Sequence, residues 1–114
     1  MLELNKVYNM DCIEGLKQLD DESINCIWTD PPYNIEYHYD TYVDKREDYF
    51  EWCDAWLKEC HRVLKQDGSI FVKMWSRYLF SFSNLLFKNG FVFKNVIIWK
   101  RKSTKRTGNQ EDVI

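Results

Sequence analysis

Most hydrophobic positions fall into short runs of strand length. Residues 24–29 and 69–75 are apolar runs bounded by polar turn residues, and residues 91–99 are rich in β-branched and aromatic side chains. Runs of this kind predict buried strands. Residues 6–10 alternate between polar and apolar side chains, which predicts a further short strand at the start of the chain.

Between these runs the hydrophobic period becomes helical. From Asp48 onward one predicted helix face is charged and the other is apolar. The apolar face comprises Tyr49, Cys53, Trp56, Leu57, Cys60 and Leu64. Shorter helices are predicted over residues 13–19, with Asp11 as a candidate N-cap, and from Ser76 to a glycine C-cap at Gly90. The alternation of strands and helices predicts an α/β fold with a largely parallel sheet flanked by helices.

The first of the long apolar runs stops abruptly at Asp30-Pro31-Pro32-Tyr33. Proline donates no backbone N–H to a ladder and restricts the residue before it, so Asp30 is expected at the carboxyl end of a strand. In open α/β sheets ligands bind at that edge. The sequence therefore presents a carboxylate, a rigid diproline and an aromatic ring at the predicted site. For Tyr33, the alternative is a packing aromatic in a loop.

Residues 34–45 form a predicted loop that is dense in acidic residues and contains Tyr37, Tyr39 and Tyr42. Above the ligand-binding edge of a sheet, such a loop serves as a lid or a base-binding wall. The alternative is a long surface connection.

Charge is unevenly distributed along the chain. The net charge is −2 overall, but residues 1–67 carry −9 and residues 68–114 carry +7. The densest basic cluster is Lys100, Arg101, Lys102, Lys105 and Arg106. A cationic surface of this kind binds phosphates, and the alternative is a solvated tail.

The cysteines and histidines show no metal-site spacing. Cys12, Cys26, Cys53 and Cys60 form no Cys-x-x-Cys pair, so the prediction is four buried free thiols and no metal. No signal peptide and no apolar run of about 18–20 residues is present, so no membrane insertion and a reducing cytoplasmic location are expected.

The motif at residues 30–33 resembles the catalytic signature of the S-adenosylmethionine-dependent DNA amino-methyltransferases, which methylate adenine N6 or cytosine N4. The similarity extends over nearly the whole chain, in the order found in the family. Its segments are residues 8–12, 30–35, 62–69 and 95–99. The resemblance implies a partial Rossmann-like methyltransferase domain.

The resemblance also implies a role for each motif residue. The Asp30 carboxylate and the Pro31 carbonyl would accept hydrogen bonds from the exocyclic amino group, with Pro32 adding rigidity. Tyr33 would stack on a base flipped out of duplex DNA, assisted by Asn34. Aspartate in first position favours adenine over cytosine.

Cofactor and DNA contacts are implied elsewhere in the chain. Asp11, together with Asp30, would contact S-adenosylmethionine, although Asp11 also reads as a plain N-cap. The basic cluster defined above would contact DNA phosphates.

The four glycines, Gly15, Gly68, Gly90 and Gly108, lie too far apart to form the Gly-x-Gly turn that holds the cofactor in this family. This fits the permuted class, in which the catalytic half comes first. Residues 1–102 are then the catalytic portion, and residues 103–114 are a basic, polar tail that starts a recognition segment. The expected enzyme is a truncated or split adenine-N6 methyltransferase, with a homodimer or a complementing C-terminal half as partner. The alternatives are an inactive nucleic-acid-binding or interaction module and an N4-cytosine methyltransferase.

Overall fold

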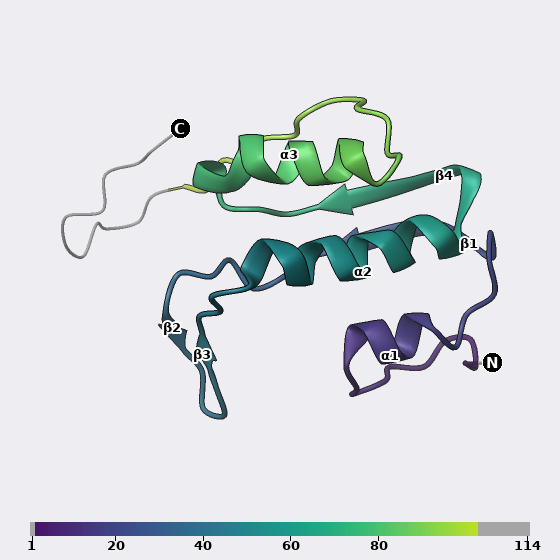
Figure 1. Ribbon diagram of the computed structural model, residues 1–114, viewed down its shortest axis with the longest axis horizontal. Helices are drawn as coiled ribbons and strands as arrows, with labels where there is room; N and C mark the ends of the chain where they lie inside the picture. The colour runs from purple at the N-terminus through teal and green to yellow at the C-terminus, as the bar shows by residue number, and fades with distance from the viewer. Residues whose placement is uncertain (1, 103–114) are drawn as a thin grey trace.

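The computed structural model describes residues 2–102 and contains two small sheets and three α-helices (Figure 1). The elements in chain order are α1 (Cys12–Leu16), β1 (Ile24–Thr29), β2 (Tyr37–His38), β3 (Val43–Asp44), α2 (Tyr49–Val63), β4 (Leu64–Val72), the 3₁₀ turn η1 (Ser76–Tyr78) and α3 (Leu79–Lys88). This mixture of helices and strands matches the predicted α/β class.

The main sheet consists of β1 and β4, which pair in parallel. Their carboxyl ends coincide, because Thr29 pairs with Val72. The helix α2 lies between the two strands in sequence, as a parallel pair requires. Within the described residues the parallel sheet has two strands, so it is smaller than predicted.

Residues 66–68, whose Asp-Gly pair is typical of a tight turn, lie inside β4. The pairing moves from Ile24–Leu64 to Cys26–Ser69, so β4 bulges opposite β1 at this point. A Cβ atom on Gly68 would lie 2.9 Å from the Asn25 carbonyl oxygen. Glycine therefore allows the close approach of the two strands.

The core lies between α2 and one face of the sheet. The buried residues of α2 are Tyr49, Cys53, Trp56, Leu57, Cys60 and Val63, which confirms the predicted apolar face up to the end of the helix. Phe82 of α3 joins this core, and Ile27 and Ile70 contribute from the sheet. On the opposite sheet face the rings of Trp28 and Phe71 stack at 5.1 Å, and Trp28 is 73% exposed. In the described structure, helices thus cover one face of the sheet and not both.

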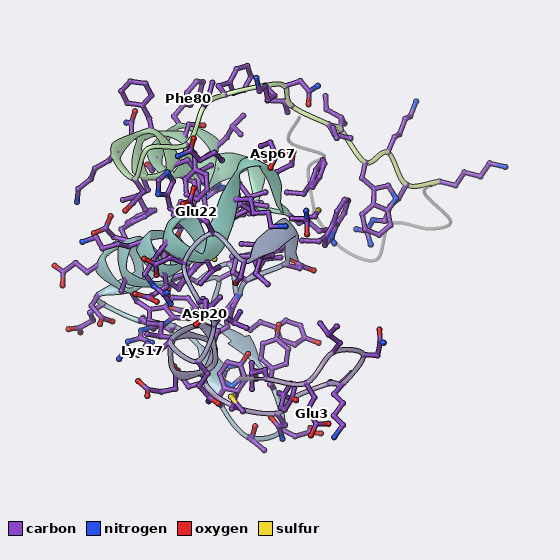
Figure 2. The ribbon with its side chains drawn as sticks, turned by 90° about the vertical axis from the view of Figure 1, so that its right-hand side faces the viewer. Glu3, Lys17, Asp20, Glu22, Asp67 and Phe80 are labelled. Carbon is purple, nitrogen blue, oxygen red and sulfur yellow. The ribbon has the colours of Figure 1, made fainter. Side chains whose placement is uncertain are left out.

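Two predicted strands are not formed. Residues 6–10 and 91–99 carry strand-like patterns but have no regular secondary structure. Most of the apolar side chains of residues 91–99 are exposed, including Trp99 at 71%, and Figure 2 shows this stretch arching away from the helices. A strand is stabilised by pairing with a neighbour, and neither segment is paired with β1 or β4 in the structure.

The end of α3 was predicted correctly, whereas the burial of two cysteines was not. Helix α3 ends with Asn89 as its C-cap and Gly90 at φ +89°, as predicted. All four cysteines are free, but Cys12 and Cys26 are exposed, so the prediction that they are buried is wrong. No helix within residues 2–102 is long and apolar enough to cross a membrane.

Replacing Leu57 by alanine is expected to lower the free energy of unfolding by about 2–5 kcal/mol. Leu57 has no exposed surface, so its removal leaves a cavity between α2 and the sheet. Urea denaturation measures the change, and Lys58→Ala on the exposed side of the same helix is the matched control. Equal stabilities of the two variants would contradict the assigned core.

Candidate active site

The candidate site begins where β1 and β4 end together. The Lys73 backbone N–H donates to the Thr29 carbonyl at 2.9 Å, which extends the ladder by one step and sets Lys73 beside Asp30. A cavity of about 300 Å³ opens at this edge. It is lined by Asp30, Pro31, Pro32, Tyr33, Ile35, Tyr37, Tyr39, Tyr42, Asp44 and Lys73. All four residues of the predicted motif therefore meet in one cavity.

Asp30 has two partners in this cavity. The Tyr33 hydroxyl donates to Asp30 Oδ1 at 2.5 Å, and the Lys73 ammonium lies 3.6 Å from Oδ2. Burial, and then the hydrogen bond to the carboxylate, raise the pKa of Tyr33 above its ordinary value. Tyr33 is thus held as a neutral donor, and Asp30 as an acceptor whose other oxygen faces a cation.

A hydrogen bond from the first residue of α2 holds the diproline. The Tyr49 hydroxyl, at the start of α2, donates to the Pro32 carbonyl at 2.5 Å. Pro31 is buried, and within residues 2–102 no hydrogen bond to its carbonyl is formed. Two acceptors thus belong to consecutive residues of the cavity lining, the Asp30 carboxylate and the Pro31 carbonyl.

Asp44 fixes the backbone that follows the motif. Its carboxylate accepts the Tyr33 N–H at 3.1 Å and the Asn34 N–H at 2.9 Å, and the residue is only 5% exposed. Asn34 adopts φ +58°, and its amide oxygen accepts the Arg46 N–H at 2.6 Å. Hydrogen bonds to a carboxylate are among the stronger ones in proteins, so Asp44 acts as a clamp on the motif.

The segment predicted as a loop contains the β2–β3 hairpin, which Figure 1 shows projecting beside the start of α2. The rings of Tyr37 and Tyr39 lie 4.7 Å apart, and those of Tyr39 and Tyr42 stack at 4.8 Å with an interplanar angle of 16°. We call Tyr37, Tyr39 and Tyr42 the tyrosine stack. All three line the cavity that contains Asp30.

The basic cluster starts close to this edge. The Lys73 ammonium lies 4.4 Å from the centre of the Trp99 ring, so residues next to Trp99 approach the Asp30 side of the sheet. Lys100, Arg101 and Lys102 follow directly and are exposed. The two remaining members of the cluster, Lys105 and Arg106, lie outside the described residues.

Asp11 lies apart from the cavity lining. Its Oδ1 accepts the Ile13 and Glu14 N–H groups at 3.0 and 3.1 Å, which makes it the N-cap of α1. The alternative interpretation of this residue as a cap is therefore confirmed. Both bonds use Oδ1, and the side chain is exposed to solvent. Among residues 2–102, no three His, Cys, Asp or Glu side chains are grouped to hold a metal ion.

Sequence reasoning missed three residues that shape the site, Lys73, Asp44 and Tyr49. Lys73 follows the last residue of β4, so the parallel register alone places it beside Asp30. Asp44 looked like one of many acidic residues in a loop, and Tyr49 like one more core aromatic. Only the fold shows that their polar atoms reach the backbone at residues 32–34.

Stability is expected to fall as the pH rises above about 10, the ordinary tyrosine pKa, because Tyr49 is held neutral in the folded state. Burial, followed by the nearby Cys53, raises the pKa of Tyr49. The unfolded chain then binds fewer protons than the folded one, which favours unfolding. Urea denaturation of Tyr49→Phe between about pH 9 and 12 should show a shallower decline than the wild type. Parallel curves would contradict this role.

Comparison with known proteins shows which family the chain resembles. Residues 24–113 match the family model N6_N4_Mtase, described as DNA methylase. This match includes β1, the Asp30 motif, the hairpin and α2.

Curated relatives show the same family. The type II methyltransferase M.BamHI of Bacillus amyloliquefaciens is 40% identical over 95 residues, which cover 76% of this chain and 22% of the relative. M.HinfI of Haemophilus influenzae is 36% identical, covering 84% and 29%. The DNA adenine methyltransferase YhdJ of Escherichia coli K12 is 35% identical, covering 90% and 35%. The matched regions thus span about a fifth to a third of these relatives. The chain belongs to the DNA methylase family of amino-methyltransferases.

Proposed function

We propose that this chain is the catalytic portion of a DNA adenine-N6 methyltransferase that uses S-adenosylmethionine and has a partial Rossmann-like fold. The observation that carries the proposal is the position of Asp30-Pro31-Pro32-Tyr33. The motif lies at the carboxyl edge of a parallel strand pair, inside a cavity that also contains Lys73. This is the edge at which α/β sheets bind ligands.

The two acceptors fit the needs of an exocyclic amino group. The lone pair of such a nitrogen is delocalised into the base, so it is a poor nucleophile. When its two hydrogens are donated to Asp30 and to the Pro31 carbonyl, the geometry that attacks a methyl group is favoured. The adenine amino group would replace the Tyr33 hydroxyl as donor to Asp30 Oδ1, which leaves the Tyr33 ring to stack on the base.

S-adenosylmethionine would supply the electrophilic methyl group on its sulfonium. On this chain, Asp11 and Asp30 would hold the cofactor. Asp11 is exposed and uses only Oδ1 in its capping bonds, so Oδ2 fits a ribose hydroxyl donor. On methylation the amino nitrogen would lose one proton, which the Asp30 carboxylate, its proposed hydrogen-bond acceptor, would take up.

Duplex DNA would approach along the basic cluster. Lys100, Arg101 and Lys102 are exposed beside Trp99, whose ring contacts Lys73 at the site. We assign Lys105 and Arg106, which continue the cluster in sequence, to the same phosphate contacts. Asn34 is assigned to the base through its side-chain amino group, because its amide oxygen is bonded to Arg46.

A complementing segment or a second copy of the chain would complete the fold. The Trp28–Phe71 face of the sheet and most of the apolar side chains of residues 91–99 are exposed. The same exposure, together with the basic segment, supports the second candidate, an inactive nucleic-acid-binding or interaction module.

Transfer of tritium from the methyl group of S-adenosylmethionine to duplex DNA tests the proposal. The proposed function predicts acid-precipitable label that depends on both the protein and DNA. DNA that is retained by the protein without becoming labelled would contradict the enzyme and support the binding module.

A further inference from the structure

The tyrosine stack is more ordered than a loop that only connects β1 to α2 needs to be. Its three rings are roughly half exposed, yet they lie in contact with one another at the edge of the cavity. Exposed aromatic faces held in this way are the surfaces on which unpaired nucleobases stack.

Backbone hydrogen bonds hold the hairpin that carries the stack. The Tyr39 N–H donates to the Tyr42 carbonyl at 2.8 Å, and the Glu36 N–H donates to the Asp44 carbonyl at 2.7 Å. The Asp44 side chain then joins the hairpin to the backbone of Tyr33. The stack and the catalytic motif are therefore one connected unit, and little ordering would be required on binding.

The charge of the hairpin indicates which part of a nucleic acid it contacts. Residues 34–46 contain three acidic residues, Glu36, Asp40 and Asp44, against Lys45 and Arg46, and Glu36 pairs with Lys45. The hairpin therefore carries no excess positive charge for phosphates, so a nucleic acid would contact it through the faces of its bases. The phosphates would instead contact the basic cluster, which begins next to Trp99 and Lys73.

We infer that the tyrosine stack is a nucleobase-stacking surface, separate from the Tyr33 ring, that holds an unpaired base at the mouth of the Asp30 cavity. This inference rests on the proposed function for its biological substrate. It needs neither the cofactor nor methyl transfer in order to be tested.

The test is the affinity of the full chain for a dye-labelled, adenine-containing single strand of about 12 nucleotides, a typical single-strand site size. Fluorescence anisotropy measures binding at several salt concentrations. Tyr39→Leu should weaken binding by about 10- to 100-fold, because the central ring of the stack is lost. The slope of affinity against salt should stay unchanged, whereas Lys100→Ala should lower it by about one.

Two further variants separate stacking from folding. Tyr39→Phe keeps the ring and should bind like the wild type. Phe80→Leu makes a similar change at an aromatic residue that is 83% exposed on α3 and outside the cavity lining, and should also bind like the wild type (Figure 2).

Wild-type affinity in Tyr39→Leu, an equal loss in Tyr39→Phe, or no binding by the wild type would overturn the inference. Tyrosine-dependent binding by a protein that transfers no methyl group would overturn the proposed function alone.

Discussion

Replacing Asp30 by alanine is expected to lower the rate of methyl transfer by about 10²–10³-fold or more, the scale for losing one preorganised polar group at a reacting centre. In the structure the Asp30 carboxylate is the side-chain acceptor at the carboxyl edge of β1, bonded to the Tyr33 hydroxyl and facing Lys73. Under the proposed function, the amino group of the base would then have one acceptor left, the Pro31 carbonyl. Single-turnover transfer of labelled methyl groups measures the loss.

Binding of DNA should survive this substitution, because the predicted phosphate contacts lie on the basic segment. Asp67→Ala is the matched control, since Asp67 is an exposed aspartate in the bulge of β4 and outside the cavity lining (Figure 2). Asp30→Asn keeps the shape of the side chain but not its charge, and its rate of methyl transfer should also be lower. If transfer by Asp30→Ala equalled that of the Asp67 control, the role assigned to Asp30 would be wrong.

Replacing Asp44 by alanine is expected to release the catalytic backbone. The Tyr33 and Asn34 N–H groups would lose a carboxylate partner that is almost fully buried. The free energy of local opening should fall by about 2 kcal/mol, so these two amides should exchange with solvent about 30-fold faster. Because a small displacement of a reacting group is costly, methyl transfer should fall by about 10²-fold. Amide exchange followed by NMR measures the first effect.

Asp40→Ala is the control for Asp44, since Asp40 is an exposed aspartate on the turn of the same hairpin. The amides of α2, such as that of Leu57, should keep their protection in both variants, which separates loss of the clamp from global unfolding. Unchanged exchange at Tyr33 and Asn34 in Asp44→Ala would show that the clamp does not hold the motif.

Local signals in the sequence were sufficient for the parts of the fold that are stabilised locally or by the core. The helical period after Asp48 gave α2 and its buried face. The apolar run closed by Pro31 and Pro32 gave β1 and the place of Asp30 at its end. Glycine at position 90 gave the end of α3.

Features that depend on contacts between distant parts of the chain were not predictable from local signals. Residues 91–99 have the composition of a strand, but they pair with neither strand of the main sheet in the described structure. The two hydrogen bonds of Asp44 join residues that are 10 and 11 positions apart in the sequence. The Lys73–Asp30 ion pair joins residues that follow two different strands, β4 and β1. Both depend on tertiary register, which a pattern of hydrophobic and polar positions does not contain.

Transfer of a methyl group to the exocyclic nitrogen of adenine is tested by the identity of the product. DNA incubated with the protein and S-adenosylmethionine is digested to nucleosides and analysed by mass spectrometry. We expect N6-methyladenine in DNA treated with the wild type and none in DNA treated with Asp30→Ala. N4-methylcytosine as the product would contradict the assigned base, and the absence of any methylated nucleoside would contradict the proposed function.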